Sequence, residues 1–260
     1  MLLLMILWVV VFVFALWLVG FCLANNFWLS TKSLRTYKHV LVVFPHADDE
    51  VWHGAGLLSL AARYGHRATW IVMTKGERGT PDAHLDEQLK KIRTEEAEAV
   101  AKLYNADLIQ ADFGDGQLDK KRSEFGAWLE TQLHTLQPDL IVTYDLAGEY
   151  GHPDHMALSE IITSLVKQKY PSTALWYATF PKLVLSLGKF PTHMAEDPAF
   201  MHKRAVARFR VFTGSSILRK LQAFYTYKSQ NKSGIAVIPY HIPAWFVYSL
   251  FWFEYFDIGN

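Results

Sequence analysis

A short apolar run followed directly by a cluster of acids is the feature that most restricts how this chain can fold. His39–Phe44 (His-Val-Leu-Val-Val-Phe) is apolar throughout its interior, as expected for a strand buried on both faces of a parallel sheet. The residues that follow it supply one imidazole and three carboxylates: His46, Asp48, Asp49 and Glu50. Ligands of open α/β sheets bind at the carboxyl ends of strands, and acids this close together are costly without a cation among them. The cluster therefore predicts a metal site, the alternative being a helix N-terminus that carries acids.

The rest of the chain alternates between strand-like and helix-like segments. Further strands are expected at Arg67–Thr74, Ala106–Gln110 and Asp139–Tyr144. Helices are expected at Val51–Tyr64, Gln88–Tyr104, Phe125–Leu136 and Met156–Lys169. Such alternation with short connections predicts one α/β domain with a Rossmann-like, mostly parallel sheet and helices on both faces.

Tyr150–His155 (Tyr-Gly-His-Pro-Asp-His) forms a second polar cluster, again just past the end of an expected strand. His152 and His155 are three positions apart, which places both imidazoles on one side of a helical turn. Asp154 between them can orient or tune an imidazole. A capped helix with two exposed histidines is the alternative. Two such clusters at the same edge of one sheet favour a single shared site.

The two clusters together offer the ligands of a hydrolytic zinc ion, which takes three protein ligands and keeps one position for water. His46, Asp49 and His155 would give two imidazoles and one carboxylate. Asp48 could then take a proton from water, and His152 could stabilise an oxyanion or protonate a leaving amine. Spacing alone does not decide which aspartate is the ligand and which is the base. The same donors would also suit Fe²⁺.

Composition narrows the classes of partner. The 260 residues carry 26 Lys and Arg against 25 Asp and Glu, a net charge of +1, so nothing indicates nucleic acid as a partner. The single cysteine, Cys22, excludes an intramolecular disulfide and a cysteine-based metal site.

Leu2–Ala24 contains no charged side chain and is long enough to cross a hydrocarbon core of about 30 Å as a helix. A cleaved signal peptide fits less well, because no Lys or Arg precedes the run and no small-residue cleavage site follows it. A buried core helix is the third reading. The basic residues after the run are Lys32, Arg35 and Lys38. The positive-inside rule then predicts a single-pass membrane protein with its catalytic domain in the cytoplasm.

The aromatic segment Ile242–Phe253 is too short to span a membrane. It could be a core strand or helix, or it could lie among lipid headgroups, where Trp and Tyr are favoured. We therefore divide the chain into a transmembrane helix (1–24), a juxtamembrane linker (25–38), a catalytic domain (39–240) and an aromatic, interfacial C-terminal segment (241–260).

Several motifs, in order, resemble those of the PIG-L / LmbE-type zinc-dependent de-N-acetylases. The family's Ala-His-Pro-Asp-Asp-Glu appears as Pro-His-Ala-Asp-Asp-Glu at Pro45–Glu50, with alanine and proline exchanged, and its Gly-His-Pro-Asp-His is intact at Gly151–His155. Weaker matches are Thr74–Gly79, the helix from Arg93, the Asp-Gly-x-Leu turn Asp115–Leu118, and Tyr227–Gln230.

The resemblance implies a role for each matched position. His46, Asp49 and His155 would bind zinc, Asp48 would be the general base, and His152 would assist at the oxyanion. Asp154 would tune His152, and Tyr150 would help to polarise the carbonyl. The residues that fall where family members contact the sugar are Glu77, Arg93 and Asp115. For Arg93 the alternative is a helix ion pair with Glu95 or Glu96.

The function that the resemblance implies is Zn²⁺-dependent removal of the acetyl group from an N-acetylglucosamine-containing glycoconjugate, with Fe²⁺ as the other candidate cofactor. The membrane segment favours a lipid-linked glycan like GlcNAc-phosphatidylinositol, with the bilayer and an amino sugar as partners. The alternatives are a membrane-anchored deacylase of a non-sugar amide and a glycan- or lipid-binding protein without catalysis. The absence of a Gly-x-Ser-x-Gly elbow argues against a serine hydrolase.

Overall fold

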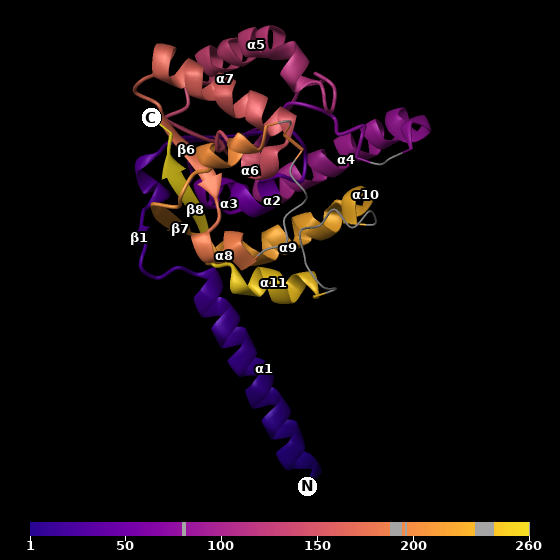
Figure 1. Cartoon of the computed structure of the whole chain (residues 1–260), viewed down its shortest axis with the longest axis vertical. Helices are drawn as coiled ribbons and strands as arrows, with labels where there is room; N and C mark the ends of the chain where they lie inside the picture. The colour runs from indigo at the N-terminus through magenta and orange to yellow at the C-terminus, as the bar shows by residue number, and fades with distance from the viewer. Residues whose placement is uncertain (80–81, 188–193, 196, 232–241, 260) are drawn as a thin grey trace.

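The fold is built on a single eight-stranded sheet. The computed structural model describes residues 1–79, 82–187, 194–195, 197–231 and 242–259. The strands lie in the order β1-β7-β8-β6-β5-β2-β3-β4 (Figure 1). Their bounds are β1 Ser30–Thr31, β2 His39–Phe44, β3 Arg67–Val72, β4 Asp107–Gln110, β5 Leu140–Tyr144, β6 Ala174–Thr179, β7 Phe209–Phe212 and β8 Phe253–Ile258. The α-helices of the described residues are α1 Leu2–Ala24, α2 Glu50–His53, α3 Ala55–Arg63, α4 Asp86–Tyr104, α5 Arg122–Leu136, α6 Gly148–Gly151, α7 Pro153–Lys169, α8 Lys182–Leu187, α9 Ile217–Thr226, α10 Lys228–Asn231 and α11 Ala244–Leu250.

The centre of the sheet is parallel. β2 pairs in parallel with β3 and with β5, and β4 and β6 extend the parallel set at either side. Along β2, Val40, Val42 and Phe44 belong to one apolar core, whereas Leu41 and Val43 belong to the other. All five side chains are fully buried. Burial on both faces explains why this strand is apolar at every interior position.

Helices cover both faces of the sheet (Figure 1). α3, α4 and α9 contribute side chains to the first core, and α5 and α7 contribute to the second. The predicted α/β class with a single sheet is therefore confirmed.

The helix expected over Val51–Tyr64 is broken, so that prediction is wrong at Gly54. There the backbone (φ −156°, ψ −20°) separates α2 from α3. A Cβ at this position would lie 2.7 Å from Val42 Cγ1 on β2. Only glycine lets the chain pass this close to the strand, and the turn sets α2, with its acids, apart from the packed helix α3.

The sheet also includes segments outside the alternating pattern. β8 runs antiparallel between β6 and β7, and β1 pairs in parallel with β7. β1 lies in the expected linker (25–38) and β8 in the expected C-terminal segment (241–260), so both parts contribute strands to the sheet. The expected boundary at 240–241 lies outside the described residues.

The N-terminal helix α1 projects away from the sheet (Figure 1). It is long and apolar enough to cross a membrane, with a mean hydropathy of 3.1 in its most apolar window. Length and composition also fit a signal sequence, so they make α1 a candidate span.

Candidate metal centre and active site

The two polar clusters lie together because their strands are neighbours in the sheet. The acidic loop follows β2 and leads into α2, while Tyr150–His155 follow β5 and lead into α7. Asp115 reaches the same place from the loop after β4. The carboxyl edge of the parallel strands thus holds both clusters, as the topology requires.

His46 lies among three carboxylates. Its Nδ1 is 3.6 Å from Asp49 Oδ2, and its Nε2 is 3.1 Å from Asp115 Oδ1 and 3.4 Å from Asp154 Oδ2. Burial alone would lower the pKa of His46, but these carboxylates, Asp115 first, raise the pKa well above its ordinary value of 6.5. The surroundings of His46 therefore favour positive charge.

His155 faces the same space with a free nitrogen. Its ring centre is 5.4 Å from that of His46, and its ring stacks on Tyr144 at 4.3 Å. Its Nε2 lies 3.7 Å from Asp49 Oδ1 and has no hydrogen-bond partner, although the residue is only 1% exposed. Burial lowers the pKa of His155 to about 4, so the imidazole is neutral near pH 7, the form that binds metals.

Asp49 is fixed from two sides. The Tyr144 hydroxyl donates to its Oδ1 at 2.9 Å, and the backbone N–H of His46 donates to its Oδ2 at 3.0 Å. Burial would raise its pKa, but the imidazoles of His155 and His46 hold the pKa of Asp49 well below its usual range. Asp49 is thus an ionised, oriented carboxylate. Tyr144 was not singled out from the sequence, although its place at the end of a strand could have drawn attention to it.

These donors fit a divalent cation. Within the described residues, two trios of ligand atoms lie within 4.8 Å of one another: His46, His152 and His155, and His46, Asp115 and Asp154. A buried imidazole nitrogen without a partner, beside an ionised carboxylate and a second imidazole, suits zinc. The set His46, Asp49 and His155 stays a prediction.

Asp48 has a strained backbone. Its φ is +108°, which L side chains rarely adopt and which costs on the order of 1–3 kcal/mol. The Glu50 carboxylate accepts from its N–H at 3.0 Å, and Arg93 Nη2 lies 3.4 Å from its Oδ1. Burial raises the pKa of Asp48 to about 6, although Arg93 opposes the shift. Such a carboxyl can take up and release a proton near neutral pH.

Glu50 supports this loop from the interior. It is fully buried and accepts from the hydroxyls of Tyr104 (3.0 Å) and Tyr227 (2.9 Å) as well as from the N–H of Asp48. Burial raises the pKa of Glu50 to about 8, while these donors lower it. Although Glu50 belongs to the acidic motif, sequence reasoning gave it no role.

The second cluster begins with His152, the N-cap of α7. Its Nδ1 accepts from the N–H of Asp154 at 3.2 Å, which leaves the proton of the neutral ring on Nε2. Burial, then His155 and His46, lower the pKa of His152 to about 3. Tyr150 meets the rings of His152 and His155 edge-on.

The Asp154 carboxylate points to the neighbouring turn as well as to His46. It accepts from the N–H groups of Gly116 (2.7 Å) and Leu118 (2.9 Å) and has no hydrogen bond to the His152 ring among the described contacts. Asp154 thus ties α7 to the turn that carries Asp115.

The three predicted sugar contacts are joined to the acidic loop, to His46 or to one another. Arg93 is 3% exposed and donates to Ala47 O, so it also braces the acidic loop. Its helix neighbour Glu96 bonds to Ser229 instead. Glu77 Oε1 accepts from the N–H of Asp115 at 2.9 Å, while its Oε2 is buried without a partner. Their contact with a sugar remains a prediction.

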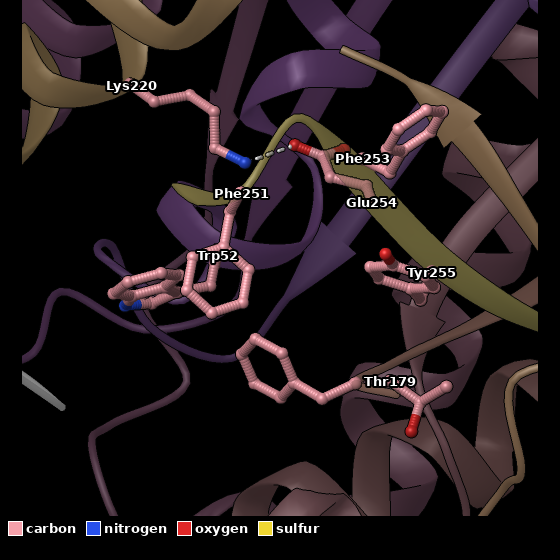
Figure 2. A pocket seen from close by; sticks show the side chains of 8 residues that line it. Trp52, Thr179, Lys220, Phe251, Phe253, Glu254 and Tyr255 are labelled. Carbon is pink, nitrogen blue, oxygen red and sulfur yellow. Dashed lines mark hydrogen bonds and ion pairs between the residues drawn. The ribbon is translucent and has the colours of Figure 1, made fainter. Parts of the chain in front are cut away.

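A separate small hollow lies behind α2. It is lined by Trp52, Thr179, Phe180, Lys220, Phe251, Phe253, Glu254 and Tyr255 (Figure 2). Lys220 Nζ lies 2.9 Å from Glu254 Oε1, and Glu254 also accepts from the N–H of Gly56 at the start of α3. This buried ion pair joins β8, α9 and α3. No predicted site residue lines the hollow.

Comparison with known proteins identifies the domain. The model of the PIG-L family, described as GlcNAc-PI de-N-acetylase, matches residues 41–166, the stretch that contains both polar clusters. Residues 41–166 are therefore similar to the PIG-L family. The resemblance noted in the motifs is thereby confirmed.

Two curated relatives that match this part of the chain are amino-sugar deacetylases. A probable N-acetyl-alpha-D-glucosaminyl L-malate deacetylase 2 from Bacillus subtilis (strain 168) is 33% identical over 139 residues, which are 51% of this chain and 62% of the relative. A 1D-myo-inositol 2-acetamido-2-deoxy-alpha-D-glucopyranoside deacetylase from Corynebacterium diphtheriae is 29% identical, over 60% of this chain and 61% of the relative. The matches thus span about three fifths of the length of these relatives.

Solved structures share the fold of the PIG-L domain. The N,N'-diacetylchitobiose deacetylase from Pyrococcus horikoshii aligns with a TM-score of 0.61 at 20% identity, over 85% of this chain and 84% of that chain. GalB, a 4-carboxy-2-hydroxymuconate hydratase, aligns with a TM-score of 0.55 at 18% identity, over 85% of this chain and 95% of that chain. Because this one architecture occurs in a deacetylase and in a hydratase, the reaction must be argued from the site.

Proposed function

We propose that the protein is a metal-dependent amidohydrolase that removes the acetyl group from an N-acetylglucosamine unit, most simply one linked to a membrane lipid. The observation that carries the proposal is the buried, unpaired Nε2 of His155, which lies beside ionised Asp49. The ring centre of His155 is 5.4 Å from that of His46. The family match and the amino-sugar deacetylases among the relatives support it.

Zn²⁺, or Fe²⁺ in its place, would be held by His46, Asp49 and His155, and when bound it would act as a Lewis acid toward the amide carbonyl and toward water. Asp48 is the base in this proposal. With a pKa raised to about 6 by burial, it is ionised near pH 7 and accepts a proton from the attacking water. Its backbone is strained, with a φ of +108°, and Arg93 donates to Ala47 O in the same loop.

The second cluster receives the charge that develops on the acetyl oxygen. Neutral His152 has its Nδ1 occupied by the N–H of Asp154, so its Nε2–H is the donor available to an oxyanion. The Tyr150 hydroxyl is the second donor. Asp48, which has taken up the proton of the water, then passes it to the departing nitrogen, because neutral His152 has no second proton to give. The C–N bond breaks, and acetate and a free amino sugar leave.

The substrate side of the proposal rests on the loop residues and on α1. In this proposal Glu77, Arg93 and Asp115 would meet sugar hydroxyls, and the unpaired Oε2 of Glu77 would accept a hydrogen bond from one of them. With α1 crossing a bilayer and the domain in the cytoplasm, the enzyme would act on a headgroup of GlcNAc-phosphatidylinositol type.

A panel of substrates tests the proposal. The purified chain is incubated with Zn²⁺ and with a soluble N-acetylglucosaminide, a lipid-linked one and a non-sugar acetamide, and free amine is measured. We expect amine from the glucosaminides, its loss with a chelator, and its return with Zn²⁺. Turnover of the non-sugar amide alone would indicate a different deacylase, and binding of the glycan without amine release would indicate a binding protein.

A further inference from the structure

The end of α1 is built into the domain. Trp17 Nε1 donates to Ser249 Oγ at 2.9 Å, and the Asn25 side chain donates to the carbonyl of Leu250. A Cβ on Gly20 would lie 3.3 Å from the Leu250 side chain, so the two helices are in contact there. α11 therefore lies beside the last two turns of α1 (Figure 1).

This contact fixes the depth of α11 if α1 spans a bilayer. The 23 residues of α1 measure about 35 Å, close to the hydrocarbon thickness of about 30 Å. Residues 2–16, which precede the contact with α11, measure only about 22 Å, less than a span requires. The part of α1 that packs on α11 must therefore enter the membrane, and α11 must reach the headgroup–acyl boundary with it.

A cluster of aromatic rings, the aromatic collar, lies at the same end of α1. It consists of Phe21, Phe27, Phe212, Trp252 and Phe253, whose rings meet in pairs at 5.2–6.3 Å. Trp28 beside it is 97% exposed, and Trp245 on the outer side of α11 is 57% exposed. Exposed Trp at this level is typical of membrane interfaces.

From these observations we infer that α11 and the aromatic collar form a membrane-docking surface that lies at the headgroup–acyl boundary of a bilayer. Inside the protein, Tyr248 of α11 stacks on Trp52 of α2 at 4.6 Å. The helix that follows the acidic loop is thus packed on the membrane-lying element, which fixes the position of the active site relative to α11. The inference rests on the membrane anchoring proposed above but not on the hydrolytic reaction.

Depth measurement on the full chain in phosphatidylcholine vesicles tests this inference. In a Cys22→Ser background, a spin label is placed by Trp245→Cys, with Val10→Cys as the bilayer control and Lys167→Cys on α7 as the aqueous control. All three positions are exposed, so labelling leaves the core intact. Collision with oxygen, which concentrates in lipid, is compared with collision with a water-soluble nickel complex.

We expect position 245 to lie between the controls, with a several-fold lower nickel collision rate than position 167. A label at 245 as accessible to nickel as the one at 167 would overturn the inference, because α11 would face water. Protection from both reagents would also overturn it, because protein would cover the surface. An aqueous signal at position 10 would refute the anchoring itself, whatever the chain does to acetamides.

Discussion

At the level of single residues, the interior of the protein holds Asp48 in an unfavourable backbone conformation. Glu50 does this from a fully buried position, accepting from the Asp48 N–H and from two tyrosine hydroxyls. Removing one hydroxyl weakens the support without touching the reacting groups.

Tyr227→Phe tests this support. It removes the hydroxyl that donates to Glu50 Oε1 at 2.9 Å, and we expect the free energy of unfolding to fall by about 1 kcal/mol. Because the Asp48 loop is less firmly held, kcat should fall several-fold with KM unchanged. Thermal melts and steady-state kinetics measure both. Tyr225→Phe, in the last turn of α9 and half exposed, is the control and should change neither. Equal effects of the two substitutions would show that the hydrogen bond from Tyr227 to Glu50 does not support the Asp48 loop.

Sequence reasoning found the motif residues but not what holds them. His46, Asp48 and Asp49 stand together in the chain, and their link to Tyr150–His155 followed from neighbouring strands. The bond from Tyr227 to Glu50 joins residues 177 positions apart and depends on the packing of α9, which no local pattern records.

At the level of helices and strands, α3 lies so close to β8 that replacing Gly56 of α3 should destabilise the fold. A Cβ on Gly56 would lie 2.5 Å from Glu254 Oε1 and 2.5 Å from Thr213 Cβ. Gly56→Ala should therefore lower the free energy of unfolding by about 1–3 kcal/mol. Gly126→Ala on α5 is the matched control, since its Cβ would meet only Ile161 at 3.5 Å, and we expect a gain of about 0.5–1 kcal/mol. Denaturant titration compares the two, and a neutral Gly56→Ala would contradict the packing described.

His39 links the start of β2 to the end of α5 and predicts a pH dependence. Its Nδ1 lies 2.9 Å from Leu136 O, its Nε2 lies 2.9 Å from Thr69 Oγ1, and burial, then Arg67, lower its pKa in spite of Asp139. Below about pH 6.5, His39 therefore binds a proton more readily in the unfolded chain than in the folded chain. The free energy of unfolding then falls as pH falls through that value. Between pH 5 and pH 8, the free energy of unfolding should change less steeply with pH in His39→Asn than in the wild type. Identical slopes would show that His39 does not contribute.

Strands with a clear local sequence pattern could be predicted, whereas a strand that forms only by pairing with segments distant in the sequence could not. β2 is apolar throughout its interior, so its burial on both faces could be predicted from the sequence. β8 follows an aromatic segment that looks interfacial, and its antiparallel pairing with β6 and β7 depends on strands far away in the sequence.

At the level of the whole molecule, the end of α1 packs on α11, so a truncation that tests membrane anchoring must keep this contact. Removing residues 1–30 would also remove Asn25, whose side chain bonds to Leu250 O and to the Trp252 N–H. Removing residues 2–14 keeps Trp17 and the contact with α11. We expect this shorter chain to keep its activity on a soluble N-acetylglucosaminide and to lose most of it on one embedded in vesicles. Equal loss on both substrates would contradict the membrane role.

The central claim is that two distant loops hold one divalent cation through His46, Asp49 and His155. Zinc content after dialysis, measured by elemental analysis, tests it most directly in the wild type, Asp48→Ala and His155→Ala, with His134→Ala as an exposed histidine control. We expect no turnover in Asp48→Ala or His155→Ala, and about one zinc per chain in all but His155→Ala. Full zinc retention by a folded His155→Ala protein would contradict it.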